Sequence, residues 1–319
     1  MTGIPKGEGP GLLKAQLAHC SNQRAYLPSD NMAKAKMAQQ DTSTLAQGCF
    51  GKVYKVKYGD QWACVKRVPV DCISETDLVR EYKVYRKAKH ANVVRLLGDP
   101  WVKDLKWNIP LEFISGEELE TTIFYPHKSK IKLNRFVQAS IISGMCAGLT
   151  YLHSKDIVHQ DIKPDNIMVE HETHRAIIID LGLAKFFRDG ISSARNLGNL
   201  AYSAPEILQQ HAVRDQRSDV WAMGKVIAEL CIGERLLTHT VTPSNIQSIL
   251  SGNPYRRAVS KMVDSNPATR ASMMTVSDKI LRAIDEILRE LLKLIVPVLD
   301  CDCLNHVRCC CKIQHKHTP

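Results

Sequence analysis

The spacing of apolar residues changes character near Leu45. Residues 1–44 combine Gly, Pro, Lys and Gln with little apolar periodicity, a composition typical of a disordered leader. The next segment is rich in β-branched and aromatic residues: Val53, Tyr54, Val56 and Tyr58. After the break at Gly59, a similar pattern continues through residues 62–68. Two such runs around a short glycine-containing break predict a β-hairpin.

One helical pattern follows the hairpin. Between Ser74 and Ala88 charged and apolar residues mix at helical spacing, with Leu78, Tyr82 and Tyr85 on one face. A single helix beside the strands predicts a small β-rich lobe.

After Glu112 the chain becomes mainly helical. The longest pattern runs from Leu133 to Leu152, and further ones cover residues 220–230 and 278–294. The long segment has one apolar stripe, which we expect to be buried: Phe136, Ile141, Met145, Leu149 and Leu152. No internal repeat of fixed period is present. The pattern therefore predicts an α+β protein of two lobes, the second larger and helical.

Two segments of the small lobe could bind phosphate groups. Leu45–Val53 reads LAQGCFGKV at the turn of a predicted hairpin, where absent side chains let backbone N–H groups approach phosphate oxygens. An ordinary glycine-containing hairpin would look the same. Lys66 lies in an otherwise apolar strand, where an ammonium needs an anionic partner such as Glu81 on the next helix. Alternatively, Lys66 points outward from an edge strand.

Two further segments place polar groups directly after apolar runs. His159–Asn166 reads HQDIKPDN and follows the long helix, so that the Asp161 carboxylate, the Lys163 ammonium and the Asn166 amide lie on one short loop. Asp180 follows the apolar run 176–179 and precedes a glycine. Carboxylate and amide oxygens are donors that Mg²⁺ shares with phosphate. These groups are suited to phosphoryl transfer.

Taken in order, these segments resemble the signature set of the eukaryotic protein kinase family: glycine loop, strand lysine, HRD loop, DFG and APE. The resemblance covers about Leu45 to Ile287 and includes the APE-like Ala204–Glu206. It implies the two-lobed kinase fold, with an N-lobe at about 45–111, a C-lobe at about 115–287 and a tail at 288–319.

The resemblance also implies roles for individual residues in a reaction that uses ATP, Mg²⁺ and a protein substrate. Asp161 would be the catalytic base, assisted by Lys163, while Lys66 would contact the α- and β-phosphates and pair with Glu81. Asn166 and Asp180 would bind two magnesium ions. The implied ATP-binding residues are Ala46, Gln47, Gly48, Cys49, Phe50, Gly51, Val53, Ala63, Lys66, Leu111, Glu112, Ile114, Glu118 and Met168.

Within the implied nucleotide site, Val53, Ala63 and Met168 would sandwich the adenine ring, with Leu111 behind it. Residues 112–114 would form the hinge, and Glu118 would reach the ribose. Outside the site, Glu206 is expected to pair with Arg270, and Asp219 to brace the catalytic loop.

Four positions depart from the family pattern. Ala46 replaces the first glycine of the loop, which we expect to reduce nucleotide affinity, and Leu181 replaces the phenylalanine of DFG conservatively. Asn199 replaces a common threonine, which leaves the hydrogen bonding on the substrate side open. Gln160 replaces the usual arginine, so no guanidinium is available there for an activation-segment phosphate. We therefore expect activity without such phosphorylation, although Ser192–Ser193 are candidate phosphosites.

The choice of Ser or Thr over Tyr as the acceptor depends on two segments. Lys163 in DIKPDN and the sequence Tyr202–Glu206, YSAPE, both resemble Ser/Thr kinases. The sequence DLGLAK is similar to the tyrosine-kinase-like branch that includes receptor-interacting kinases.

Charge and cysteine content bear on location. Lys and Arg outnumber Asp and Glu by 43 to 33, a formal net charge of +10 that is commonly a solvated surface, and we expect no nucleic-acid partner. With no signal-peptide pattern and no long apolar run, we expect a cytoplasmic protein.

Five of the eleven cysteines lie together in the tail: Cys301, Cys303, Cys309, Cys310 and Cys311. Beside the apolar segment that precedes them they could be S-acylated, which would give peripheral membrane association. With His306, His315 and His317 they could instead bind zinc, or the tail could have no special function.

Two other functions fit the fold. A pseudokinase would use the same fold as a binding scaffold with weak or no catalysis, and the changes at Ala46 and Gln160 are in its favour. A small-molecule kinase is less consistent with the APE-like segment, which in protein kinases helps to build a platform for a protein substrate.

Overall fold

The computed structural model describes residues 43–48, 51–186, 198–209 and 214–289. Two compact units divide the chain: Met1–Val79 with Arg95–Phe113, and Arg80–Val94 with Ile114–Pro319. The last boundary between them falls after Phe113, inside the segment expected to be the hinge. The predicted leader, up to residue 42, and the cysteine-rich tail lie outside the described residues, and β1 begins at Ser43, two residues before the expected start of the domain.

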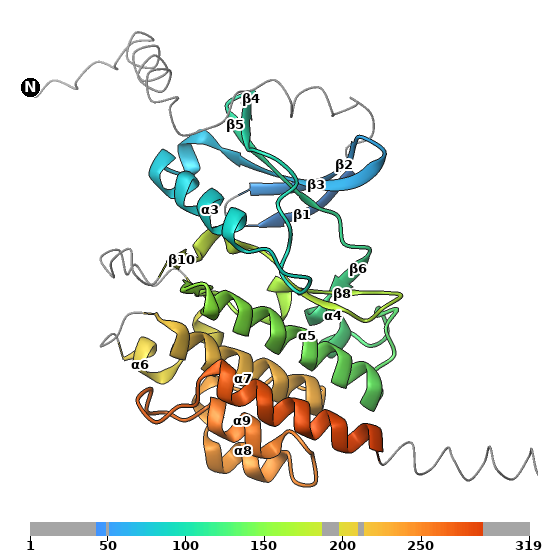
Figure 1. The fold of residues 1–319 in the computed structure, drawn as a ribbon, viewed down its shortest axis with the longest axis vertical. Helices are drawn as coiled ribbons and strands as arrows, with labels where there is room; N and C mark the ends of the chain where they lie inside the picture. The colour runs from blue at the N-terminus through green and yellow to red at the C-terminus, as the bar shows by residue number, and fades with distance from the viewer. Residues whose placement is uncertain (1–42, 49–50, 187–197, 210–213, 290–319) are drawn as a thin grey trace, which may run out of the picture. The chain divides into compact units, whose positions relative to one another are not determined.

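The first unit contains a five-stranded antiparallel sheet in the order β1-β2-β3-β5-β4 (Figure 1). Its strands are β1 (Ser43–Gly48), β2 (Gly51–Tyr58), β3 (Gln61–Pro69), β4 (Trp101–Lys103) and β5 (Lys106–Glu112). Gly59 has φ of 62° in the turn between β2 and β3, a conformation that glycine adopts without a steric penalty. The predicted hairpin is confirmed.

Alternating residues of the sheet form the core of the first unit. Val56, Ala63, Val65 and Trp101 are buried together with Tyr58, and the apolar contacts among them stabilise the sheet.

Helix α3 (Glu75–Lys87) begins in the first unit and ends in the second. Leu78, Tyr82 and Tyr85 are all at most 5% exposed, as the stripe predicts. The helix is stabilised by charges that complement its dipole: the acidic Glu75 and Asp77 lie in the first turn, and the basic Arg86 and Lys87 lie in the last.

The described part of the second unit is mainly helical but also contains five short strands. Its helices are α4 (Leu119–Phe124), α5 (Arg135–Ser154), α6 (Pro205–Leu208), α7 (Gln216–Ile232), α8 (Pro243–Ile249), α9 (Arg256–Met262) and a further helix that includes residues 273–289. Its strands are β6 (Gly116–Glu118), β7 (Ile157–Val158), β8 (Ile167–Glu170), β9 (Ala176–Ile178) and β10 (Lys185–Phe186). They form two antiparallel sheets, β6-β8-β9 and β10-β7.

Helix α5 corresponds to the longest predicted pattern. The side chain of Asn134 caps it by accepting hydrogen bonds from the N–H groups of Phe136 and Val137. Phe136 was expected in the buried stripe but is 47% exposed, and that expectation is wrong. Val137 and Ile141 are four residues apart and share the buried face, whereas Phe136 is turned about 100° away from Val137.

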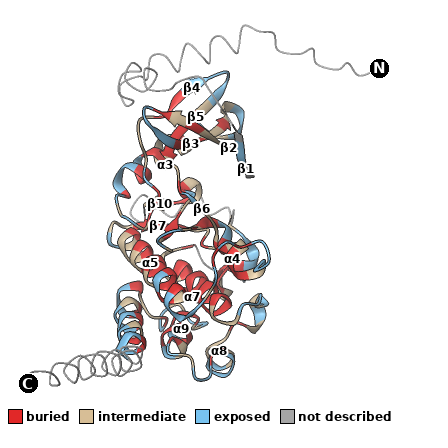
Figure 2. Ribbon diagram, turned by 90° about the vertical axis from the view of Figure 1, so that its right-hand side faces the viewer, coloured by how far each residue is buried: buried red, intermediate tan, exposed pale blue. Residues whose placement is uncertain are grey.

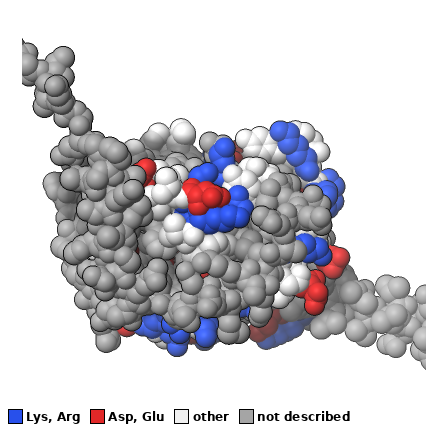
Figure 3. All heavy atoms as spheres, turned by 90° about the horizontal axis from the view of Figure 1, so that it is seen from above, with Lys and Arg blue, Asp and Glu red and all other residues white. Residues whose placement is uncertain are grey.

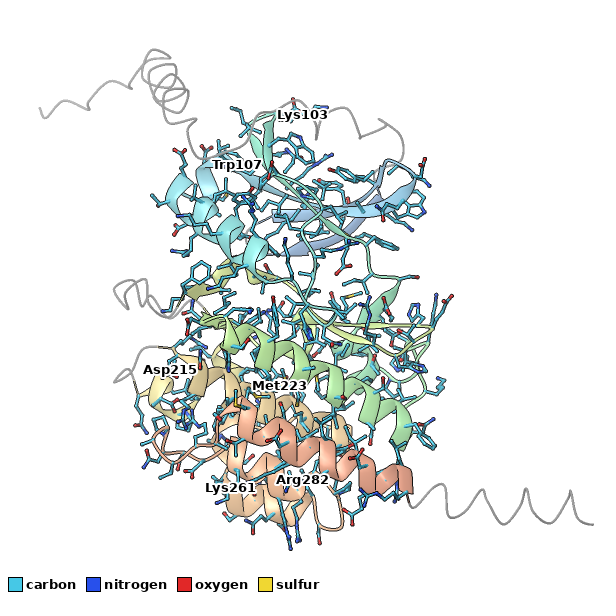
Figure 4. All side chains as sticks on the ribbon, in the orientation of Figure 1. Lys103, Trp107, Asp215, Met223, Lys261 and Arg282 are labelled. Atoms are coloured by element: carbon cyan, nitrogen blue, oxygen red, sulfur yellow. The ribbon has the colours of Figure 1, made fainter. Side chains whose placement is uncertain are left out.

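Helix α7 is the central helix of the second unit. Every residue from Ser218 to Leu230 is buried, and Figure 2 shows this helix red along most of its length. A capping box between Asp215 and Ser218 begins α7, and Gly233, with φ of 76°, ends it. Asp215 is labelled at the start of α7 in Figure 4, with Met223 further along. The helix therefore offers a fixed element against which loops can be anchored.

The charges on the uncovered part of one face are interspersed. In Figure 3, Lys and Arg side chains form several separate groups with Asp and Glu beside some of them. No helix among the described residues is long and apolar enough to cross a membrane.

Candidate functional site

The loop 159–166 joins β7 to β8 in the second unit. His159 is fully buried, and its Nε2 lies 3.1 Å from the carbonyl oxygen of Ile179. Gln160 has φ of 70°, a left-handed conformation that is uncommon for a residue other than glycine. The loop is therefore shaped by specific contacts rather than by local preference.

The Asp219 carboxylate, in the first turn of α7, anchors this loop. It accepts hydrogen bonds from the main-chain N–H groups of His159 (2.8 Å) and Gln160 (2.9 Å), and Nε2 of His153 lies 3.1 Å from it. Asp219 is 2% exposed, so these bonds form away from competing water. The predicted bracing role of Asp219 is confirmed.

Three donors orient the carboxylate of Asp161. Its Oδ1 accepts a hydrogen bond of 3.0 Å from the main-chain N–H of Asn199. Its Oδ2 accepts one of 2.8 Å from Nδ2 of Asn166 and lies 3.3 Å from Nζ of Lys163. The three groups predicted on this loop thus converge, with Asn199 as a fourth member.

A main-chain hydrogen bond connects the segment before Asp180 to this cluster. The N–H of Ile179, the residue before it, donates a 2.9 Å hydrogen bond to the carbonyl oxygen of Asn166. Asp180 has φ of 55° and its Oδ1 accepts from the N–H of Gly182 at 3.3 Å. Asp residues are enriched in this left-handed region, which here starts a short 3₁₀ turn, Leu181–Leu183.

The donor set of Asn166 and Asp180 fits a divalent cation that also binds phosphate. Nδ2 of Asn166 makes two hydrogen bonds to Asp161, both 2.8 Å, so the carbonyl Oδ1 is the part of the amide suited to a metal ligand. No group of three or more His, Cys, Asp or Glu that could hold a metal occurs among the residues the structure describes. Phosphate oxygens and water would have to complete the coordination, as Mg²⁺ prefers.

The predicted phosphate-binding loop lies in β1 and β2 of the first unit. Gly48 pairs with Gly51 at the turn, and Ala46 pairs with Val53 next to a register shift. Cys49 and Phe50 lie outside the described residues. A Cβ at Gly51 would collide with the carbonyl oxygen of Arg67. Packing within the sheet therefore also requires this glycine.

The other predicted ATP-binding residues of the first unit lie on β3 and β5. Lys66 pairs with Val53 on one side and Ile109 on the other, so the alternative of an edge strand is wrong. Ala63 is fully buried and Leu111 is 7% exposed.

Glu112, at the end of β5, is held by Arg95. Its Oε1 accepts from the main-chain N–H of Arg95 at 2.9 Å, and its own N–H donates to the Arg95 carbonyl oxygen.

Glu81, Ile114, Glu118 and Met168 belong to the second unit. Glu81 is 2% exposed, and Glu118 on β6 pairs with Met168 on β8. Burial raises the pKa of Glu118, and Asp165 raises it further. Because Lys66 and Glu81 are described in different units, their ion pair and the adenine sandwich stay predictions.

The pair predicted outside the nucleotide site is present. Arg270 is 1% exposed and binds both carboxylate oxygens of Glu206, at 2.7 and 2.8 Å. This bidentate ion pair joins the start of α6 to the segment before residues 273–289.

Two departures from the family pattern acquire definite contacts. Nε2 of Gln160 donates a hydrogen bond to the carbonyl oxygen of Leu183, so a neutral side chain bonds the main chain just after Asp180. Asn199 uses its side chain locally, accepting from the N–H of Ala201 at 2.8 Å, and it offers Asp161 its main-chain N–H.

Sequence reasoning missed Arg214 and Ser203. Nη1 of Arg214 donates to the carbonyl oxygen of Gln160 at 3.0 Å, and Nη2 donates to Oγ of Ser203 at 2.6 Å. An arginine just before the capping Asp215 was the available signal, but an arginine near a helix start is usually exposed.

Comparison with known sequences agrees with this geometry. A profile described as the protein kinase domain matches residues 40–307. The chain belongs to the protein kinase family. The predicted family and the predicted α+β kinase fold are confirmed.

Several individual relatives are plant kinases. The chain is 33% identical over 202 residues to a G-type lectin S-receptor-like serine/threonine-protein kinase of Arabidopsis thaliana, covering 61% of this chain and 24% of that protein. It is 30% identical over 200 residues to the serine/threonine-protein kinase AtPK2/AtPK19 of the same plant, covering 60% and 40%.

A third relative, an A. thaliana leucine-rich repeat receptor-like protein kinase, is named as one not expected to be active. It is 33% identical over 204 residues, covering 60% of this chain and 20% of the relative. The chain thus spans less than half of the length of each of these relatives.

Proposed function

We propose that this chain is a Ser/Thr protein kinase that transfers the γ-phosphate of ATP to a hydroxyl group of a protein substrate. The observation that carries the proposal is the Asp161 carboxylate, held by Asn199, Asn166 and Lys163 in one orientation. A base that must receive a proton from an aligned hydroxyl benefits from such fixing, because misorientation is costly in rate.

The residues of the loop would divide the chemistry among them. Asp161 would accept or orient the proton of the attacking hydroxyl, while Lys163, whose Nζ lies 3.3 Å from it, would offset charge on the transferred phosphoryl group. Oδ1 of Asn166 and the carboxylate of Asp180 would hold Mg²⁺. That metal would supply charge neutralisation on the phosphates.

The first unit would supply most of the nucleotide contacts. Lys66, paired on both sides within the sheet, would reach the α- and β-phosphates and Glu81 would pair with it. The turn between Gly48 and Gly51 would cover the phosphates. Val53, Ala63 and Met168 would enclose adenine, with Leu111 behind it.

The contacts at the edge of the nucleotide would come from both units. Glu112 and Ile114 would form the hinge, and Glu118 would reach the ribose. Gln47, Cys49 and Phe50 would complete the loop with Ala46.

Phosphoryl transfer to a generic Ser/Thr peptide tests the proposal. Asp161→Asn keeps the size of the side chain but removes the base, so we expect kcat to fall by about 10²- to 10⁴-fold with ATP binding nearly unchanged. Lys66→Met should weaken phosphate contacts as well. Equal activity of wild type and both variants would leave only the scaffold function. That alternative is worth testing because one relative is named as a kinase not expected to be active.

The outer parts of the chain carry separate proposals. We propose a kinase domain at 45–287, a cytoplasmic location, and S-acylation of the tail cysteines as the route to any peripheral membrane association. Fractionation after changing all five tail cysteines to Ser tests the last point, and unchanged membrane recovery would exclude it.

A further inference from the structure

A buried arginine outside the kinase signature joins two segments that flank Asp161. Arg214 lies just before the first turn of α7 and is 7% exposed. Its guanidinium donates to the carbonyl oxygen of Gln160 at 3.0 Å and to Oγ of Ser203 at 2.6 Å. A planar, permanently charged fork is suited to hold two acceptors at a fixed separation.

The hydrogen bonds continue from Ser203 to the base. Oγ of Ser203 donates to the carbonyl oxygen of Asn199 at 3.0 Å, and the N–H of Asn199 donates to Oδ1 of Asp161 at 3.0 Å. The other arm of Arg214 holds the carbonyl of Gln160, the residue directly before Asp161. Both the main chain of the base and one of its donors are thus connected to a single side chain.

The packing at Gly198 independently supports this arrangement. A Cβ added there would lie 2.6 Å from the carbonyl oxygen of Gln160 and 2.8 Å from Cζ of Arg214. Both distances are shorter than van der Waals contact, so the glycine before Asn199 lets its segment lie directly against the hydrogen bond between Arg214 and Gln160.

Arg214 brings a positive charge to the loop, which the neutral Gln160 cannot do. Burial lowers the pKa of Arg214, whereas the carboxylates of Asp219 and Asp161 favour its charged form. The cation that is missing at position 160 is therefore supplied to the loop by another element.

We propose that Arg214 is a positioning residue for Asp161, acting through Gln160 on one side and through Ser203 and Asn199 on the other. The inference rests on the proposed kinase function, since positioning matters only if Asp161 takes part in the transfer. It explains why an arginine is buried at a position that contacts no part of the reacting phosphate in the proposed mechanism.

The test compares Arg214→Met, Arg214→Lys, Ser203→Ala and the double variant Arg214→Met/Ser203→Ala with wild type. We expect kcat per folded molecule to fall by about 10- to 100-fold in Arg214→Met. The fall should be about fivefold in Ser203→Ala, with KM for ATP within about twofold in both. Arg214→Lys, which keeps the charge but not the fork, should recover part of kcat.

The double variant separates positioning from general damage. If the two residues act in series, its kcat should match that of Arg214→Met alone, whereas independent effects would multiply. Arg175→Met, which removes an arginine that binds the β8 residue Glu170, is the matched control and should retain wild-type kcat. Unchanged kcat in folded Arg214→Met, or multiplied effects in the double variant, would overturn the proposal.

Amide hydrogen exchange at Asn199 gives a readout without catalysis. Ser203→Ala should speed exchange of this amide by about fivefold or more, because the carbonyl oxygen of Asn199 keeps its hydrogen bond from the N–H of Tyr202 but loses the one from Oγ of Ser203. If Arg214→Met fails to fold, Ser203→Ala decides the question, and unaltered kcat with unaltered exchange would reject the link. Inactive wild type would refute the proposed function. The rate of amide exchange at Asn199 in wild type and variants would then decide whether Arg214 and Ser203 hold this segment in place.

Discussion

Asn166 makes two hydrogen bonds of 2.8 Å with Asp161, one from Nδ2 to Oδ2 and one from the same nitrogen to the main-chain carbonyl oxygen. The amide nitrogen is thus fully used within the loop. This pair fixes both the proposed base and the proposed metal ligand, so neither can rotate without disturbing the other.

The first prediction concerns this pair. Asn166→Asp would place a second carboxylate against Oδ2 of Asp161 and remove the donor, so we expect kcat to fall by about 10²- to 10³-fold. Steady-state kinetics at several Mg²⁺ concentrations measure the effect. Asn245→Ala, which removes an amide that donates to Thr240 in the loop before α8, should be neutral for kcat. An Asn166→Asp variant with wild-type kcat would refute the assigned role.

The second prediction concerns regulation. Because Gln160 bonds the carbonyl of Leu183 without any phosphate, we expect phosphatase-treated protein to keep its activity within about twofold of mock-treated protein, a difference of under 1 kcal/mol. Gln160→Ala should lower kcat in both samples equally. Ser192 and Ser193 lie outside the described residues. Phosphatase treatment removes any phosphate from them, so the assay includes both sites. Loss of all activity after phosphatase treatment, with normal ATP binding, would contradict the prediction.

The third prediction concerns stability. Arg270→Ala would leave the Glu206 carboxylate without its bidentate partner, so we expect unfolding free energy to fall by about 3–5 kcal/mol. Urea denaturation measures it. Arg270→Lys keeps the charge but not the second hydrogen bond, so its free energy of unfolding should lie between those of wild type and Arg270→Ala. A change below 1 kcal/mol in Arg270→Ala would show that Glu206 finds another partner.

The fourth prediction concerns pH. Hydrogen bonds from Arg175 lower the pKa of Glu170 below its ordinary value of 4.5 in the folded protein. The ionised carboxylate therefore stabilises the fold above pH 4.5, and this contribution is lost as pH falls through the lower folded-state pKa. Glu170→Gln should destabilise the protein at pH 7 and have little effect at pH 3.

Denaturation curves at the two pH values check the fourth prediction. In an Arg175→Met background the substitution should lose most of its effect at pH 7, because the main cause of the shift is gone. An equal effect of Glu170→Gln at both pH values would exclude the ion pair as its cause.

The parts of the fold that sequence predicted well are those set by local pattern. The hairpin around Gly59 follows from two β-rich runs on either side of a glycine, and helices α3 and α5 follow from helical spacing. The cluster of Asp161, Lys163 and Asn166 was predictable because the three residues lie within six positions of the chain. Phe136 failed because a stripe counted from a helix start is uncertain by one position, or about 100°.

What sequence did not predict depends on contacts between distant segments. Arg214 is 54 residues from Gln160, and the N–H of Asn199 is 38 residues from Asp161. No periodicity connects such positions. A main-chain N–H donor is also present in every residue except proline, so the residue type does not indicate it. The short strands β6, β7, β8 and β10 were missed for a related reason, since two to four residues are too few for alternation to be visible.

The anchoring of the catalytic loop on α7 has a consequence for synthesis. Asp219 follows His159 by 60 residues, so the ribosome makes the loop well before its anchor. A nascent chain that ends before α7 would carry HQDIKPDN with its main-chain N–H groups still exposed to water, and docking of the buried helix would be the step that sets their geometry. The enzyme would then acquire its catalytic base late in folding, after most of the chain that could bind nucleotide has emerged.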